Sequence, residues 1–348
     1  MKTGLLTFYG ADSYGAVLQA YALQQTLLKL GTDCEFVDIR MPKRTAAPQQ
    51  SVPASPAMAV FAKRLQTEGQ KRAALFARFR TEHLRISRPY EPSEHIADDF
   101  DLFVAGSDQI WNLQIPDADS RYFLPFARPE QRCSYAASFG GDGIPEQAKD
   151  WIAAQLSGFR AVSVRENSGI QVVKALTGRD AAVCLDPTLL LNKDEWDLLA
   201  AQEDPQPCVT LFLLKYDETL VSLARAEAEQ EGLPLRIITA SFMPKLGTEP
   251  WVGTGVPQWL SAIRNARCVF TNSFHGMVFS MLFERPFRVA RLGGELAGRN
   301  GRIEELLQEL ELSSALEQVV RPDYGAVRSR MEAKKAASLA YLEELVGK

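Results

Sequence analysis

Four polar loops carry side chains that could bind an anion or move a proton. They span residues 9–15, 105–112, 163–169 and 271–287, and each follows an apolar, strand-like run. In open α/β sheets, ligands bind at the carboxyl ends of the strands. These four loops are therefore the candidate site.

The loop TNSFHGMVFSMLFERPF, residues 271–287, has the strongest pattern for function. It places Asn272, Ser273 and His275 where a predicted strand passes into a helix. Backbone N–H groups and the helix dipole at such a point favour an anion. His275 could donate a hydrogen bond or a proton near neutral pH. A purely structural histidine is the alternative, but the position favours function.

The loop SVRENSG, residues 163–169, places Arg165 and Glu166 at a predicted strand end. The guanidinium group of an arginine can donate two parallel hydrogen bonds to a carboxylate or a phosphate. A structural ion pair would explain the same two residues, because many buried pairs have no other role.

The two remaining loops offer carboxylates and hydroxyls to an acceptor. AGSDQIWN, residues 105–112, contains Ser107, Asp108 and Trp111, whose flat ring could stack on a sugar. Asp108 could equally cap a helix or bond its own loop. YGADSYG, residues 9–15, contains Asp12 and Ser13 but no G-x-G-x-x-G fingerprint, so a tight turn with a helix cap explains it as well.

The elements around these loops predict an α/β fold with parallel sheets. Apolar positions three and four residues apart predict a helix over 14–30 between strands at 3–8 and 34–39. The same alternation continues to residue 290. We expect an N-terminal Rossmann-like domain at 1–190 with a proline-rich excursion at 41–57, a second at 191–325, and a C-terminal helix at 326–348. Further strands are expected at 101–106, 133–138, 161–166, 181–186, 208–214, 235–240, 267–272 and 287–290.

Composition and charge narrow the class of partner. The chain has 348 residues, a net charge of −4 and 46% hydrophobic residues, so it favours a soluble globular protein and gives no case for nucleic-acid binding. No apolar run is long enough for a signal-peptide core or a transmembrane helix, which predicts a cytoplasmic protein. Peripheral contact with the inner face of a membrane is left open. The basic stretch 58–83 predicts a solvated helix face, and contact with a phosphorylated lipid or acidic acceptor is the alternative.

Cysteine and histidine patterns give no sign of a metal site. Five cysteines are spread through apolar runs without a C-x-x-C pair, which predicts buried free thiols. The three histidines are far apart in sequence. We therefore expect no metal ion.

Taken together, six blocks resemble the polysaccharide pyruvyl transferase family. They are DSYGAVLQAYALQ, FVAGSDQIWN, SYAASFG, SVRENSG, CLDPTLLL and TNSFHGMVFSMLFERPF, in family order, with NGRIEELL (300–307) resembling a late segment. The resemblance implies a GT-B-like fold, two Rossmann-like domains facing a cleft, with the N-terminal domain on the acceptor side and the C-terminal helix packing back on it. It also implies transfer of a pyruvyl group from phosphoenolpyruvate to a sugar, forming a cyclic ketal.

The resemblance further implies a donor site, from whose family pattern this sequence departs at one position. Arg165 matches a family arginine, and His275 matches the histidine of an Arg-Leu-His run, in which Phe274 takes the leucine position and Ser273 the arginine position. The charge that Ser273 lacks could come from one of three nearby arginines. These are Arg285, Arg291 and Arg299.

The chemistry of this transfer suggests a role for each loop. Phosphoenolpyruvate carries a carboxylate and a phosphate, its methylene carbon needs an acid, and the attacking hydroxyl needs a base. The expected catalytic residues are His275, Asp12 and Asp108. The expected donor residues are Arg165, Asn272, Ser273, Phe274, His275, Gly276 and Arg285. The expected acceptor residues are Ser13, Tyr14, Ser107, Asp108 and Trp111.

We expect no cofactor besides phosphoenolpyruvate as co-substrate. The acceptor, a cell-wall polymer, an exopolysaccharide precursor or a lipid-linked intermediate, is left open. Two other functions also fit the sequence: a nucleotide-sugar glycosyltransferase of the GT-B fold, and a glycan- or anion-binding relative that has lost catalysis.

Overall fold

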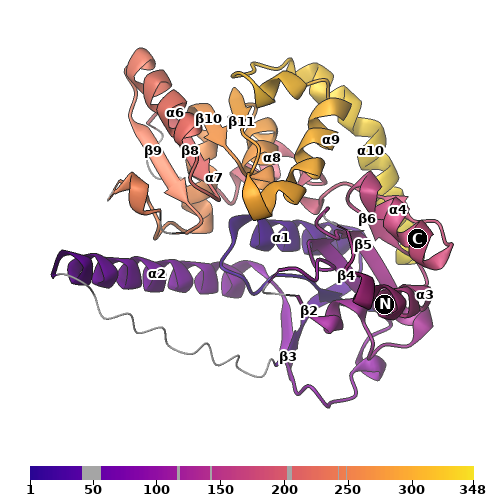
Figure 1. The fold of residues 1–348 in the computed structure, drawn as a ribbon. Coiled ribbons are helices and arrows are strands. Elements are labelled where there is room, and N and C mark those ends of the chain that lie inside the picture. Colours follow the sequence, from indigo (N-terminus) through magenta and orange to yellow (C-terminus); the bar gives the residue numbers. More distant parts are fainter. Residues whose placement is uncertain (41–55, 116–117, 142, 202–205, 242, 248) are drawn as a thin grey trace.

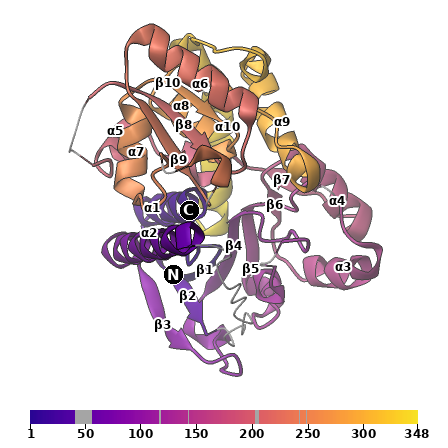
Figure 2. The same ribbon diagram turned by 60° about the vertical axis from the view of Figure 1, so that its left-hand side comes forward.

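The computed structural model describes residues 1–40, 56–115, 118–141, 143–201, 206–241, 243–247 and 249–348. It contains two parallel sheets, of seven strands in the order β3-β2-β1-β4-β5-β6-β7 and of four in the order β11-β10-β8-β9 (Figures 1 and 2). The α/β fold with two parallel sheets is thus confirmed, in the GT-B-like arrangement that we expected.

The first sheet and its helices take up the chain as far as residue 197. Its strands are β1 (Lys2–Leu6), β2 (Asp33–Ile39), β3 (Ile86–Tyr90), β4 (Leu102–Asp108), β5 (Arg132–Ala137), β6 (Ser163–Val164) and β7 (Ala182–Val183). The helices are α1 (Tyr14–Lys29), α2 (Pro56–His83), α3 (Lys149–Ser157), α4 (Asn167–Thr177) and the short α5 (Lys193–Asp197).

The second sheet begins after residue 207. Its strands are β8 (Cys208–Leu213), β9 (Leu235–Thr239), β10 (Ala266–Thr271) and β11 (Phe287–Val289). Its helices are α6 (Glu218–Glu231), α7 (Val256–Arg264), α8 (Phe274–Leu282) and α9 (Gly301–Glu309), with a 3-10 helix at Gly294–Asn300, and the chain closes with α10 (Tyr324–Leu345).

Most predicted elements appear within a few residues of their expected bounds, and the exceptions have physical causes. β3 was not predicted, because it is an edge strand with exposed residues and Pro89 near its end. The strands expected at 161–166 and 181–186 shorten to two residues each. Of the expected excursion at 41–57, residues 41–55 lie outside the described part of the chain, and α2 already begins at Pro56.

The sheet order places the candidate loops together. In the first sheet the strand order reverses between β1 and β4, and in the second between β8 and β10. All strand pairs are parallel, so the loops after these four strands leave from the carboxyl edges. A reversal of this kind opens a crevice at the carboxyl edge, where ligands bind.

An aromatic core joins the two sheets. Tyr14 of α1 stacks on Trp259 of α7 with ring centroids 5.1 Å apart, and Phe76 of α2 packs on Tyr14 at 5.2 Å. Phe212 of β8 meets Trp259 at 5.3 Å. Helices α1 and α2 lie between the first sheet and the second unit in both views (Figures 1 and 2). Packing of this kind fixes how the two carboxyl edges face each other.

The C-terminal helix returns to the first sheet, as predicted. In Figure 1, α10 runs from the second unit down to the first, where the C-terminus lies. The Tyr341 hydroxyl donates to the Ser134 carbonyl at 3.0 Å, and the Leu185 N–H donates to Ser338 Oγ at 3.0 Å. Leu342 and Leu345 are buried in the core beside β1 and β2.

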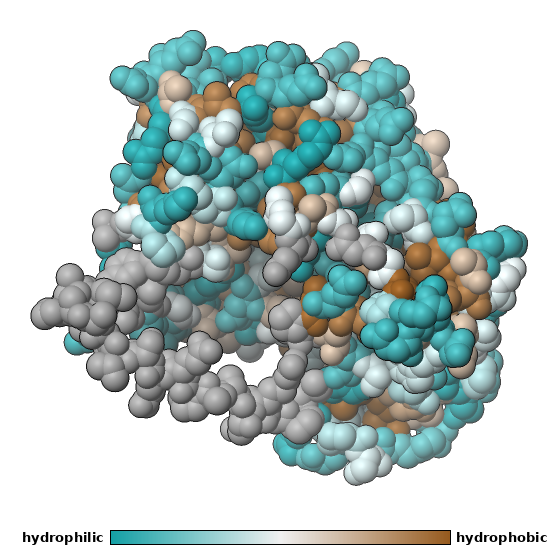
Figure 3. Space-filling view, viewed as in Figure 1, coloured by the Kyte–Doolittle hydropathy of each residue, from teal (hydrophilic) through white to brown (hydrophobic). Residues whose placement is uncertain are grey.

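The face seen in Figure 3 is mainly hydrophilic, with apolar residues in separate small patches. Within the described residues, no helix has both the length and the apolar character needed to cross a membrane.

Candidate active site

A cavity of about 290 Å³ lies between the carboxyl edges of the two sheets. Its walls come from the loop after β1, the end of β4, helix α2, the ends of β8, β9 and β10, and the segment before α9. The polar residues that line it are Asp12, Ser13, Tyr14, Arg72, Asp108, Gln109, Ser273, His275, Arg299 and Arg302. The fold thus brings together residues from three of the four predicted loops.

His275 occupies the first turn of α8, at the cavity wall. The Ser273 side chain caps this helix by accepting from the Gly276 N–H at 3.2 Å. The imidazole lies directly against Gly15 of α1, where an added Cβ would be 2.1 Å from His275 Nδ1. The other ring nitrogen, Nε2, is 3.4 Å from Asp186 Oδ2. The ring is therefore held between a glycine and a buried carboxylate.

Asp186, three residues after the end of β7, is the polar centre beneath the cavity. Its Oδ2 accepts from Arg165 Nη1 at 2.8 Å, and its Oδ1 accepts from the Thr188 hydroxyl at 2.7 Å. Burial by itself raises the pKa of Asp186, but His275 and Arg165 lower the pKa further, to well below the usual range of a carboxyl group. Asp186 is therefore ionised, and its carboxylate faces His275 Nε2.

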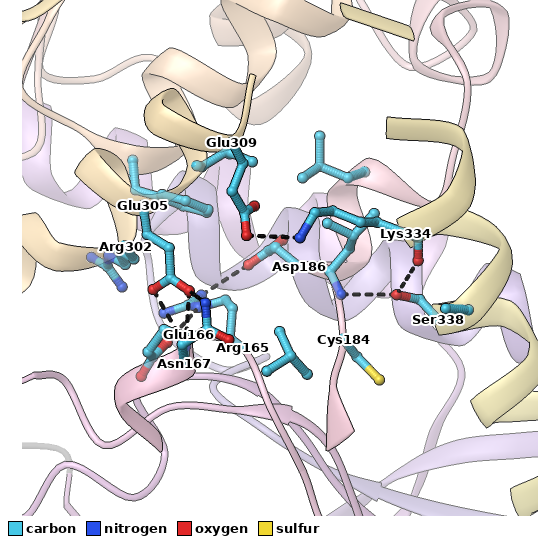
Figure 4. A pocket seen from close by; sticks show the side chains of 16 residues that line it. Arg165, Glu166, Asn167, Cys184, Asp186, Arg302, Glu305, Glu309, Lys334 and Ser338 are labelled. Atoms are coloured by element: carbon cyan, nitrogen blue, oxygen red, sulfur yellow. Dashed lines mark hydrogen bonds and ion pairs between the residues drawn. The ribbon is translucent and has the colours of Figure 1, made fainter. Parts of the chain in front are cut away.

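Arg165 lies behind the cavity wall rather than in the cavity. Its side chain is 2% exposed and pairs with Asp186, so the structural pairing considered above is present, although with Asp186 as its closest partner. Arg165 Nε and Nη2 have no hydrogen-bond partner among the described residues. Arg165 also lines a smaller cavity of about 140 Å³, which Figure 4 shows together with Glu166 and Asp186.

Phe274 and Arg302 form the wall between the two cavities, since both residues line each of them. The guanidinium carbons of Arg165 and Arg302 each lie 5.3 Å from the centre of the Phe274 ring. The ring thus holds two cations beside each other by cation–π contact.

Asp108 ends β4 in a left-handed backbone conformation, with φ of 67°. Aspartate tolerates this conformation better than most residues, and such outliers are frequent at functional sites. Its Oδ1 lies 3.7 Å from Arg165 Nη2 and 3.9 Å from Arg302 Nη1. The carboxylate therefore sits between two arginines at the cavity edge.

Asp12 also reaches the cavity, and α2 supports it. Arg80 Nη1 donates to Asp12 Oδ1 at 2.9 Å, and Arg72 Nη2 donates to the Asp12 carbonyl at 2.8 Å. Ser13 occupies the N-cap position of α1, but its side chain makes no capping hydrogen bond. Two basic residues of the 58–83 stretch thus hold the site, while Lys63, Arg64 and Arg78 are exposed.

Among the expected acceptor residues, three side chains are already engaged in the fold. Trp111 is 1% exposed, stacked on Phe123 at 5.5 Å, and its ring therefore offers no face to a sugar. The Tyr14 hydroxyl donates to the Thr254 carbonyl at 2.8 Å, although the residue lines the cavity. Ser107 is fully buried, and its Oγ lies 3.4 Å from Asp186.

Three expected donor residues also have other roles. Asn272 uses its amide to bond the Leu214 N–H at 2.8 Å and the Lys215 carbonyl at 2.7 Å, which fastens β10 to β8. Gly276 lies on Thr271, where an added Cβ would be 2.4 Å from Oγ1. Arg285 follows the far end of α8 and donates to the Phe283 carbonyl, so it is a helix length away from His275.

Of the three arginines considered as a source of the charge that Ser273 lacks, one lines the cavity. Arg291 pairs with Glu304 on the surface and Arg285 faces away, whereas Arg299 lines the cavity. Sequence reasoning missed Asp186 and Arg302 altogether. Both lie in blocks with family likeness, CLDPTLLL and NGRIEELL, and Asp186 is the last residue of the strand predicted at 181–186, which was the available signal.

Within the described parts of the chain, no group of three or more His, Cys, Asp and Glu side chains is placed to hold a metal ion. All five cysteines are buried and free, as predicted.

Comparisons with known proteins give the family. The family model described as polysaccharide pyruvyl transferase matches residues 14–290, most of the chain. No curated protein matches the sequence significantly. Among solved structures, a putative UDP-N-acetylglucosamine 2-epimerase from Listeria monocytogenes has a TM-score of 0.49 at 11% identity, covering 97% of this chain and 96% of its own.

The UDP-GlcNAc 2-epimerase from Neisseria meningitidis has a TM-score of 0.47 at 9% identity, covering 98% of this chain and 100% of its own. At such low scores and identities, these two likenesses say nothing of this protein's activity. The family match spans both sheets and the loops that build the cavity. This chain belongs to the polysaccharide pyruvyl transferase family.

Proposed function

We propose that this protein transfers the pyruvyl group of phosphoenolpyruvate onto two hydroxyl groups of a saccharide, forming a cyclic ketal and releasing phosphate. The observation that carries the proposal is the convergence of His275, two aspartates and three arginines on one cavity between the sheets. Family membership supports a transferase that acts on a polysaccharide or its precursor.

The donor is a small anion with two charged groups, and the cavity has matching features. Arg299 and Arg302 supply positive charge, and the backbone N–H groups of the first turn of α8 lie at the same wall. A pocket of this size suits a three-carbon phosphate ester beside the end of a sugar.

His275 is the proposed general acid. Ionised Asp186 faces Nε2 and helps to orient the ring, from which a proton passes to the methylene carbon of the donor. The first sugar hydroxyl bonds to the central carbon as this proton arrives. The second hydroxyl then forms the ketal, while the bond to phosphate breaks and phosphate leaves with the electron pair.

Asp12 and Asp108 are the proposed bases for the two hydroxyl protons, with Ser13 as a further acceptor contact. The scheme needs no metal ion and no cofactor besides the co-substrate. A lipid-linked saccharide at the inner membrane surface is compatible with a soluble enzyme of this kind.

The test is turnover of phosphoenolpyruvate with saccharide acceptors. Phosphate release should require an acceptor, and the product should gain the mass of one pyruvic acid less one water. His275→Ala should abolish release. Binding of a nucleotide sugar without any binding of phosphoenolpyruvate would contradict the proposal, and so would unchanged turnover in His275→Ala.

A further inference from the structure

Arg302, in the first turn of α9, is a buried cation whose charge the protein does not neutralise closely. Its side chain is 12% exposed, and its Nε has no hydrogen-bond partner among the described residues. The closest carboxylate contact is Asp108 Oδ1 at 3.9 Å, beyond hydrogen-bond distance. Arg165, by contrast, donates to Asp186 at 2.8 Å.

Neutral groups hold the Arg302 guanidinium in place. One is the Phe274 ring, 5.3 Å from the guanidinium carbon. The other is Gln109: with its amide oxygen turned toward Arg302, it accepts from Nη1 at 2.9 Å and from Nη2 at 3.2 Å. These two contacts therefore fix the orientation of the Arg302 guanidinium but do not neutralise its charge.

The surroundings make this charge costly without a ligand. Burial, followed by the nearby charge of Arg165, lowers the pKa of Arg302 to about 10. Arg299 lines the same cavity and adds a further positive charge, while the Asp12 carboxylate there is already paired with Arg80. A buried charge is stable only when it is paired, so an anion entering the cavity would relieve this cost.

We propose that Arg302 is an anion anchor of the donor site and binds a carboxylate or phosphate oxygen of phosphoenolpyruvate beside His275. This inference rests on the proposed function for the identity of the anion, but the anchor itself depends only on the geometry around Arg302. It assigns the charge that Ser273 lacks to a residue on α9, far along the chain.

The test compares Arg302→Met with Arg291→Met by calorimetry, using inorganic phosphate and phosphoenolpyruvate as separate probes. Methionine keeps the apolar stem and removes the charge. Arg291 is exposed, pairs with Glu304 and lies outside the cavity lining, so it is a matched control. A buried charge-assisted hydrogen bond predicts a Kd about 10- to 100-fold higher in Arg302→Met. Arg291→Met should stay within about twofold of wild type.

Turnover separates anion binding from a structural role. Arg302→Met should raise KM for phosphoenolpyruvate and leave KM for the saccharide unchanged, whereas a packing defect would affect both. If Arg302→Met does not fold, Arg302→Lys and Arg302→Gln carry the comparison, since the two side chains are similar in length and differ in charge. Lysine should retain more phosphate affinity than glutamine.

The outcomes keep the two proposals apart. If wild-type protein binds phosphate through Arg302 but does not bind phosphoenolpyruvate, the result would contradict the proposed function and still support the anion site. Wild-type affinity for both probes in folded Arg302→Met, or equal affinity in the lysine and glutamine variants, would overturn the anchor. Failure of wild type to bind either probe would overturn both.

Discussion

Gly15 determines where the His275 ring lies, and Gly15→Ala should therefore inactivate the enzyme without unfolding it. A Cβ at position 15 would be 2.1 Å from Nδ1, 2.6 Å from Cε1 and 2.7 Å from Cγ of His275. Ordinary van der Waals contact begins near 3.4 Å, so the ring must move by about 1 Å or more. Such a displacement also disturbs the contact of Nε2 with Asp186 Oδ2, which is 3.4 Å in the native structure.

The expected loss is about 100-fold in kcat/KM, because an error of about 1 Å in placing a reacting group costs roughly this much. Overpacking opposes stability by about 1–3 kcal/mol, offset in part by the better helix propensity of alanine. The assay is acceptor-dependent phosphate release from phosphoenolpyruvate, together with a denaturant melt. Gly10→Ala is the control, because no neighbouring atom lies within 4 Å of its added Cβ and it belongs to the same loop.

A spectroscopic readout checks the cause. The chain has three histidines, so NMR signals of the imidazole rings can be assigned by substitution. Gly15→Ala should shift the His275 signals and leave those of His83 and His95 in place. Activity equal to that of Gly10→Ala, with unchanged His275 signals, would refute the reasoning.

Three further predictions concern charge, packing and thiols. Asp186→Asn should lower stability at pH 7 by about 3–5 kcal/mol, because buried Arg165 loses its closest anion. Folding lowers the pKa of Asp186, so its carboxylate stabilises the fold above the unfolded pKa of about 3.9, and this stabilisation is lost as pH falls below that value. Urea melts should therefore show that wild type loses more stability than Asp186→Asn between about pH 5 and pH 2. Trp111→Ala should lower the free energy of unfolding by about 3–5 kcal/mol, because the ring is buried, and should leave the KM for the saccharide unchanged in the folded variant. A raised KM would instead place Trp111 in the acceptor site. Burial raises the pKa of the Cys34 thiol to about 12 and that of the Cys133 thiol to about 11, so mass spectrometry should detect alkylation at pH 8 only after unfolding, and rapid labelling of native protein would contradict their burial.

Sequence patterns were sufficient for the elements and for the edge on which the site lies. Continuous apolar runs such as CVTLFL, all of whose residues are buried, mark strands of a parallel sheet. Polar residues after such runs must gather at the carboxyl edge, since parallel strands end on the same side. His275, Asp12 and Asp108 were found for this reason, and all three line the cavity.

The same patterns could not separate a loop residue that faces the cavity from one that faces the core. Trp111 and Asp108 stand three positions apart after one strand, yet one is buried among aromatic rings and the other edges the cavity. Asn272 and His275 differ likewise, because the Asn272 amide bonds the neighbouring strand. Local sequence fixes neither direction, since each depends on side chains that arrive from distant segments.

By itself, then, the sequence determined the α/β alternation, the two sheets, the returning C-terminal helix and the family likeness. Only the tertiary structure decided that Asp186 lies beside His275, and that Arg165 and Arg302 both pack on the Phe274 ring. The physical reason is that the neutralisation of a charge depends on how far apart side chains lie in three dimensions. Whether an arginine is neutralised or left for a ligand depends on distances of a few ångströms between side chains that different elements of the fold bring together.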